Sequence, residues 1–294
     1  MIPFVERLRR GVILADGAWG SMLMSRGLPP NQSPETWTLE RPEILRAIAR
    51  EYLEAGAEIL TTNTFGGTTL ALSRHRLEQR AVEINATGVA ILRDIAEGRA
   101  YVSASIGPTG RLLAPLGDLR PDAAEAAFAA QIETIAEAGA DLLCIETMSD
   151  PAEAVLAIHA AKRVAPALPV IATMTFELTP RGPYTLMGTS VEAAARLLAE
   201  AGADVVGANC GEGVRQMTVV AEAFAAHSRL PVAIRPNAGL PLRQGRQLVY
   251  AELPEDFAKA AAALLQPGVA VLGGCCGTTP AHIRALRSVL AARV

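Results

Sequence analysis

The 294-residue sequence has few cysteines, little excess charge and no long apolar segment. No apolar run approaches the ~18 residues that a membrane-spanning helix needs. The first ten residues contain no apolar core followed by small cleavage-site residues, so they do not read as a signal peptide. A formal net charge of −3 leaves no broad basic surface for nucleic acid. We therefore expect a cytoplasmic protein that binds neither membranes nor nucleic acids.

Two familiar sequence patterns are also missing. The chain has only four cysteines and no C-x-x-C pair, the usual mark of a zinc site. In the reducing cytoplasm, so few cysteines favour metal or catalytic roles over a disulfide framework. No G-x-G-x-x-G follows the first apolar segment, which weakens the doubly wound sheet, the main rival fold.

A short pattern occurs three times, as Glu-Ala-Gly-Ala followed by an acidic residue and two apolar ones, starting at Glu54, Glu137 and Glu200. It is typical of a helix that ends in a glycine cap and leads into a strand. The repeat therefore indicates successive αβ units and a parallel sheet.

Apolar runs between alanine-rich helical stretches, such as residues 121–138 and 191–201, predict eight strands buried on both faces. The predicted strands are residues 11–14, 58–62, 100–105, 141–146, 169–175, 204–209, 231–235 and 269–273. Eight such strands with intervening helices predict an α/β fold in which residues 1–294 form a single (β/α)8, or TIM, barrel. Its active site is expected at the C-terminal ends of the strands, with the long irregular segments 19–34 and 239–254 as the rim.

Three cysteines fall at predicted strand ends. Cys210 lies in Gly-Ala-Asn-Cys-Gly, and Cys275 and Cys276 lie in Gly-Gly-Cys-Cys-Gly. Three converging thiolates would form a soft, tetrahedral zinc site with one open position, which is typical of catalytic zinc. The alternative is that they are small buried residues of the core, the role assigned to Cys144, which lies inside a predicted strand.

The ligand type indicates the chemistry. A free thiol with a pKa near ~8.5 is mostly protonated at neutral pH, and zinc replaces that proton. An all-sulfur site keeps the bound thiolate nucleophilic, which favours alkyl transfer to sulfur over hydrolysis. Asp16 and Glu146, also at strand ends, suit a substrate ammonium, and glycine-rich backbone amides suit its carboxylate. The alternative for Asp16 and Glu146 is a local turn or helix cap.

The sequence resembles the zinc-dependent homocysteine S-methyltransferases over nearly its whole length. This family includes the betaine– and S-methylmethionine–homocysteine methyltransferases and the homocysteine-binding module of cobalamin-dependent methionine synthase. The matching segments are Asp16-Gly17-Ala18, Thr62-Asn63-Thr64-Phe65, Gly107-Pro108-Thr109-Gly110, Glu146-Thr147, Gly207-Ala208-Asn209-Cys210 and Gly273-Gly274-Cys275-Cys276-Gly277.

The resemblance implies that the chain forms methionine from homocysteine. It implies that Cys210, Cys275 and Cys276 bind zinc and act in catalysis. It further implies that Asp16 and Glu146 hold the homocysteine ammonium, and that Asn209 helps to orient the amino acid.

The methyl donor is less defined. Animal-type betaine enzymes carry tyrosines where this chain has Gly66 and Thr147, and a quaternary ammonium donor favours an aromatic cage. The remaining aromatic candidates are Trp19, Trp37 and Tyr184. One barrel leaves no room for a corrinoid or pterin module, and no D-x-H-x-x-G corrinoid motif is present. We therefore expect a methylcorrinoid supplied by a separate carrier protein.

Several alternatives stay open at this point. Betaine, S-methylmethionine or methyltetrahydrofolate are the other donors, and another small thiol or selenol is the other acceptor. A non-catalytic zinc- or thiol-binding barrel is a further reading, although the presence of both Asp16 and Glu146 counts against it. The oligomeric state is open, a homo-oligomer included.

Overall fold

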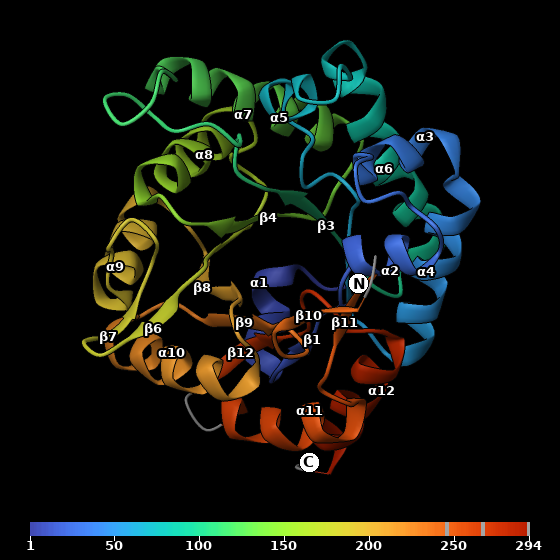
Figure 1. Cartoon of the computed structure of the whole chain (residues 1–294), viewed down its shortest axis with the longest axis vertical. Coiled ribbons are helices and arrows are strands. Elements are labelled where there is room, and N and C mark those ends of the chain that lie inside the picture. Colours follow the sequence, from blue (N-terminus) through green and yellow to red (C-terminus); the bar gives the residue numbers. More distant parts are fainter. Residues whose placement is uncertain (245–246, 266–267, 293–294) are drawn as a thin grey trace.

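Eight parallel strands close into a barrel surrounded by helices, as the sequence predicts (Figure 1). The computed structural model describes residues 1–244, 247–265 and 268–292. The barrel strands are β1 (Ile13–Leu14), β2 (Ile59–Thr61), β3 (Tyr101–Ile106), β4 (Leu142–Met148), β5 (Val170–Met174), β8 (Val205–Cys210), β9 (Val232–Pro236) and β12 (Val269–Leu272). They pair in the order β1-β12-β9-β8-β5-β4-β3-β2, and a parallel bridge between Ala15 and Ile59 joins the two ends.

The helices cover the outside of the barrel, except the first, which precedes β1 and packs at the N-terminal end of the strands. The helices are α1 (Phe4–Arg7), α2 (Gly20–Ser25), α3 (Trp37–Glu40), α4 (Pro42–Ala55), α5 (Thr69–Ser73), α6 (Ala81–Ala96), α7 (Pro121–Glu137), α8 (Pro151–Val164), α9 (Val191–Ala201), α10 (Val214–His227), α11 (Pro254–Ala261) and α12 (Pro280–Ala291). Short 3-10 turns occur at Leu8–Arg10, Pro34–Thr36, Glu78–Arg80 and Ala262–Leu265. Within the described residues, no helix combines the length and apolar character needed to cross a bilayer.

The repeated glycines end helices as predicted. Gly56 after α4 and Gly202 after α9 take left-handed conformations, with φ of 103° and 105°. These φ values are open to glycine at little cost, whereas a Cβ would strain them. Each glycine thus turns the chain from a helix into the next barrel strand.

Two apolar layers explain the continuous apolar runs of the strands. The larger core lies between the strands and the outer helices. A second cluster fills the inside of the barrel with side chains such as Ile59, Leu142 and Val271. At the N-terminal end of the strands, α1 inserts Phe4 edge-on against Tyr101, with ring centroids 5.5 Å apart. The N-terminal end of the barrel is therefore closed, and polar groups are left to its other end.

The predicted rim segments are more regular than expected. Segment 19–34 contains α2, and segment 239–254 contains a hairpin of β10 (Pro241–Gln244) and β11 (Gln247–Tyr250), with residues 245 and 246 outside the described part. A second hairpin, β6 (Glu177–Thr179) with β7 (Gly182–Tyr184), also follows a barrel strand. The glycine and proline residues of these segments are typical of irregular loops. A hairpin needs only a few strand-forming residues on each side of its turn, so it can form in such a segment without a clear sequence pattern.

Candidate metal and substrate site

Three cysteine sulfurs meet at the C-terminal end of the barrel. Cys210 is the last residue of β8, and Cys275 and Cys276 follow β12. In the strand order of the barrel, only β9 lies between β8 and β12. All three Sγ atoms lie within 4.8 Å of one another, and those of Cys210 and Cys275 are 3.1 Å apart. Cys144 is 2% exposed inside the barrel, in the core position that the sequence predicts.

The sulfurs share their protons unequally. Hydrogen bonds donated by Cys210 and Cys275 lower the pKa of Cys276 to about 3. Donation to Cys275 and Cys276 raises the pKa of Cys210 well above its ordinary value. The Tyr250 hydroxyl of β11 also donates to Cys276. One ionised sulfur beside two polarisable thiols is a donor set that suits zinc, whose binding would release the remaining protons.

Asn209 holds the backbone beside these sulfurs. Its side-chain oxygen accepts hydrogen bonds from the Thr147 N–H and the Thr173 hydroxyl, both at 2.8 Å. Its Nδ2 donates to the Thr147 hydroxyl at 2.7 Å and lies 3.5 Å from the Cys210 sulfur. Thr147 and Cys210 have φ of 62° and 66°, which is unusual for residues other than glycine. Asn209 itself is fully buried, so its contacts are with the strand ends and the sulfurs.

The two predicted carboxylates lie on neighbouring parts of the same barrel end. Asp16 follows β1 and is fully buried, while Glu146 in β4 is 7% exposed and accepts a hydrogen bond from the Ser105 hydroxyl. Burial raises the pKa of both carboxyl groups above the ordinary value, and the charge of Arg235 acts in the opposite direction.

Arg235 is the main residue that the sequence reasoning missed. It lies in β9, is 6% exposed, and pairs with Asp16 at 3.0 Å and with Glu146 at 3.5 Å. Burial lowers the pKa of this guanidinium, but both carboxylates raise it more, so it stays charged. The signal was available, since the predicted strand 231–235 ends on this arginine.

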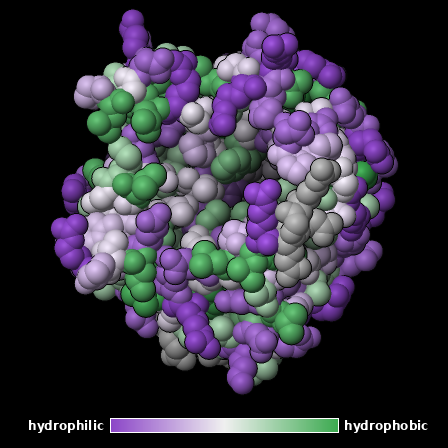
Figure 2. All heavy atoms as spheres, in the orientation of Figure 1, coloured by the Kyte–Doolittle hydropathy of each residue, from purple (hydrophilic) through white to green (hydrophobic). Residues whose placement is uncertain are grey.

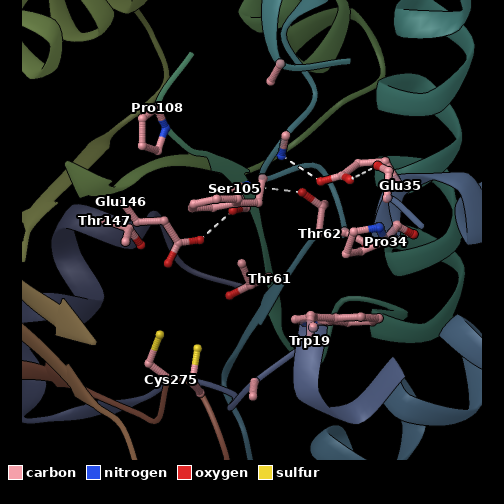
Figure 3. A pocket seen from close by; sticks show the side chains of 18 of the residues that line it. Trp19, Pro34, Glu35, Thr61, Thr62, Ser105, Pro108, Glu146, Thr147 and Cys275 are labelled. Carbon is pink, nitrogen blue, oxygen red and sulfur yellow. Dashed lines mark hydrogen bonds between the residues drawn. The ribbon is translucent and has the colours of Figure 1, made fainter. Parts of the chain in front are cut away.

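A pocket of about 400 Å³ opens beside the sulfurs (Figure 3). The three cysteines, Glu146 and Arg235 all line it, whereas Asp16 and Asn209 lie behind its wall. In Figure 3, Glu146 faces Cys275 across the cavity, and Glu35 lies on the side away from the sulfurs. Figure 2 shows a hollow near the centre of this face of the molecule.

The outer wall includes side chains that the sequence reasoning did not select. Glu35 is 4% exposed and accepts a hydrogen bond from the Gly66 N–H at 2.6 Å. Phe65 and Arg74 also line this part of the pocket. His75, expected in a helix, lies in the turn after α5 and lines the same pocket, because α5 already ends at Ser73.

The three aromatic side chains considered for a methyl-donor site lie in different surroundings. Trp19 lines the pocket and donates its indole N–H to Asp16 at 3.1 Å. Trp37 is 5% exposed and packs in the outer core. Tyr184 lies in the β6–β7 hairpin beneath the Arg181 guanidinium. Among these three, only Trp19 is placed to contact a bound molecule.

Comparisons with known proteins identify the family. A family model described as homocysteine S-methyltransferase matches residues 13–290. Methionine synthases from Mycobacterium tuberculosis (strain ATCC 25618 / H37Rv) and Mycobacterium leprae (strain TN) are 32% and 30% identical over 304 residues. Each alignment covers 98% of this chain and 25% of the relative, so the chain spans about a quarter of their length.

A solved structure confirms the fold. The homocysteine methyltransferase MmuM from Escherichia coli, in its metallated form, superposes with a TM-score of 0.80. The match covers 96% of this chain and 99% of that one at 23% sequence identity. The (β/α)8 architecture is therefore shared with a protein whose metallated state is known.

Proposed function

Because the chain belongs to the homocysteine S-methyltransferase family, we propose that it transfers a methyl group to the sulfur of homocysteine and forms methionine. The observation that carries this proposal is the group of three sulfurs at one end of a pocket that also contains Glu146. Zinc held by Cys210, Cys275 and Cys276 would lower the pKa of a thiol that occupies its open position, which supplies a nucleophilic sulfur at neutral pH.

The residues of the chain hold the rest of the substrate. Glu146 gives the buried end of the pocket a carboxylate that favours the substrate ammonium. Asn209 fixes Thr147 and Cys210, and so the direction from which a methyl group must approach. Placing the sulfur and the methyl group in line supplies much of the rate gain in such a transfer.

We further propose that the methyl group arrives on a corrinoid carried by a separate protein or domain. Six leucines on the segments that follow β3, β5 and β9 are between 49% and 74% exposed: Leu112, Leu116, Leu178, Leu186, Leu240 and Leu242. Figure 2 shows apolar surface at several points around the hollow. Apolar side chains gathered around an opening favour a macromolecular partner over a small donor.

One observation favours a small cationic donor instead. Glu35 places a buried carboxylate in the outer wall of the pocket, near Phe65. A sulfonium or quaternary ammonium group prefers such surroundings. Both Glu35 oxygens already accept hydrogen bonds, from Gly66 and Ser33, and this lowers the weight of the alternative.

The test is methionine formation by zinc-loaded protein from homocysteine and one donor at a time: methylcobalamin, methyltetrahydrofolate, betaine or S-methylmethionine. We expect turnover with methylcobalamin, loss of zinc and activity in Cys276→Ser, and retention of both in the matched control Cys144→Ser. Turnover with betaine or S-methylmethionine and none with methylcobalamin would replace the corrinoid proposal. Full zinc content in Cys276→Ser would reject the ligand set.

A further inference from the structure

A buried charge cluster of Asp16, Arg235 and Glu146 lies at the inner end of the pocket. The two carboxylates differ in how much hydrogen-bonding capacity they have left. Asp16 accepts from the Thr61 hydroxyl and Arg235 on one oxygen, and from the Thr61 N–H and Trp19 on the other. A carboxylate has about four lone-pair sites, so Asp16 is saturated, and it does not line the pocket.

Glu146 has capacity to spare. One oxygen accepts from Ser105, and the other meets only Arg235 NH1, at 3.5 Å. Because Glu146 lines the pocket, an ammonium group can reach its second oxygen from the cavity. Glu146 is therefore the carboxylate of the cluster that is placed to bind a substrate cation.

Arg235 also lines the pocket and has donor capacity left. Its Nε–H donates to the Gly274 carbonyl at 3.3 Å, one NH2 proton goes to Asp16 at 3.0 Å, and the Cys144 sulfur accepts a weak hydrogen bond. A guanidinium has five N–H groups, so one remains without an acceptor among the described residues and another makes only the long contact to Glu146. The planar guanidinium matches a carboxylate better than any other side chain does.

An α-amino acid presents one ammonium and one carboxylate on the same carbon, and the pocket presents Glu146 and Arg235 as neighbours. We infer that Arg235 binds the substrate α-carboxylate and Glu146 the α-ammonium, while Asp16 acts as a positioning residue that holds Arg235. This inference rests on the proposed function and names the amino-acid recognition set within it. It reassigns Asp16, which the family resemblance places on the ammonium.

The geometry also explains why a cation is needed at this point. With zinc bound, the three thiolates and the metal carry a net charge of −1, and Glu146 adds another negative charge to the lining, so the cavity would repel an incoming carboxylate. Arg235 offsets part of that negative charge and turns the inner wall into a site for a zwitterion. A site without the arginine would favour amines over amino acids.

The experiment compares three thiols by calorimetric titration of zinc-loaded protein. Homocysteine carries both charged groups, 3-amino-1-propanethiol lacks the carboxylate, and 4-mercaptobutanoate lacks the ammonium. Losing one partner of a buried charge pair corresponds to at least about a 30-fold change in Kd. The wild type should therefore prefer homocysteine over each analogue by at least about that factor.

The variants then assign the two contacts. Arg235→Gln should bring the preference over 3-amino-1-propanethiol close to one and keep the preference over 4-mercaptobutanoate. Glu146→Gln should bring the preference over 4-mercaptobutanoate close to one and keep the preference over 3-amino-1-propanethiol. Asp16→Asn should reduce the preference over 3-amino-1-propanethiol, as Arg235→Gln does. If Asp16 instead bound the substrate ammonium, Asp16→Asn would reduce the preference over 4-mercaptobutanoate. Arg196→Gln, which removes an exposed arginine from α9, should change neither.

A purely structural arginine would weaken all three thiols alike and leave both preferences intact, and that result would overturn the inference. If Arg235→Gln does not fold, Arg235→Lys replaces it and should give an intermediate preference, because lysine keeps the charge without the planar fork. Equal affinity of the wild type for homocysteine and 3-amino-1-propanethiol would also overturn it. If the inference fails but homocysteine still binds and is methylated, the proposed function stands. If homocysteine does not bind at all, both the inference and the proposed function are rejected.

Discussion

At the scale of single residues, Asn209 connects the three cysteines to the strand that carries Glu146. One side chain accepts from the Thr147 backbone and reaches towards two of the three sulfurs. The left-handed backbone of Thr147 and Cys210 depends on such support, because each costs on the order of 1–3 kcal/mol. The position of the sulfurs is therefore set partly by a residue that lies outside the pocket.

We predict that Asn209→Ala lowers zinc affinity about 10- to 100-fold, as is usual when a group supporting a metal ligand is removed. It should also lower the free energy of unfolding by about 1–3 kcal/mol, because the Thr147 N–H loses its buried acceptor. Competition with a chromophoric chelator measures the first quantity and urea denaturation the second. Asn31→Ala, an exposed substitution, is the control, and equal zinc affinity in the two variants would contradict the assigned role.

Arg235 also shows where reading the sequence stopped short. Asp16, Glu146 and the cysteines could be selected because carboxylates and thiols follow several predicted strands, and the C-terminal ends of barrel strands meet at one mouth. A single arginine after Val-Ala-Ile is read as the point where the chain emerges into solvent, since arginine is mostly exposed. Its burial between two carboxylates depends on the spatial neighbourhood of β9, β1 and β4, which local sequence does not contain.

At the scale of secondary-structure elements, α12 links the cysteine pair to the rim. Its N-terminus begins three residues after Gly277 and is capped by Thr279 together with His282. The Nδ1 atom of His282 accepts from the Thr279 N–H at 3.1 Å, so the ring proton lies on Nε2 and is donated to the Glu252 carbonyl. The contact to the Thr279 N–H requires a neutral imidazole, because a protonated ring has no acceptor nitrogen.

We predict that protonation of His282 lowers the free energy of unfolding as the pH falls. Burial lowers the pKa of His282 in the folded chain. The unfolded chain therefore binds more protons below the ordinary pKa near ~6.5, and stability falls as the pH drops through that value. His282→Gln keeps the capping pattern of threonine and glutamine and should give a flatter curve of Tm against pH between about 7.5 and 5.5. Parallel curves for the two proteins would rule out this role.

The barrel strands could be predicted from the sequence, whereas the two hairpins could not, and the difference has a physical reason. Strands buried on both faces leave continuous apolar runs, so all eight barrel strands could be placed within a few residues of their observed bounds. The β6–β7 hairpin and the described side chains of β10 and β11 are exposed or half-exposed, and the sequences of these segments carry no strong periodicity. Their pairing depends on the barrel that holds their ends together.

At the scale of the whole molecule, the two ends of the barrel have separate tasks. Apolar layers and the α1 plug occupy the N-terminal end, while the charged cluster and sulfurs occupy the other. Phe4 is 4% exposed although it lies only four residues from the start of the sequence. Stability and chemistry should therefore respond to different sets of substitutions.

We predict that Phe4→Ala lowers the free energy of unfolding by about 3–5 kcal/mol, the range for removing a buried phenylalanine. Homocysteine affinity, measured at a temperature about 20 °C below the midpoint of unfolding, should stay within about twofold, since none of the described residues of α1 lines the pocket. Chemical denaturation and calorimetry measure the two effects. Val5→Ala, at a neighbouring side chain that is 42% exposed, is the matched control and should change neither quantity.

The buried group of Asp16, Arg235 and Glu146 has a consequence for how this chain can change under selection. Replacing a buried ionic group by apolar side chains of similar volume is often neutral or stabilising, by about 1–4 kcal/mol. Selection for heat resistance alone would therefore not retain these three residues, whereas selection for the proposed binding of an amino acid would. Relatives that have lost that binding should lose this cluster early, long before the apolar layers beneath it begin to drift.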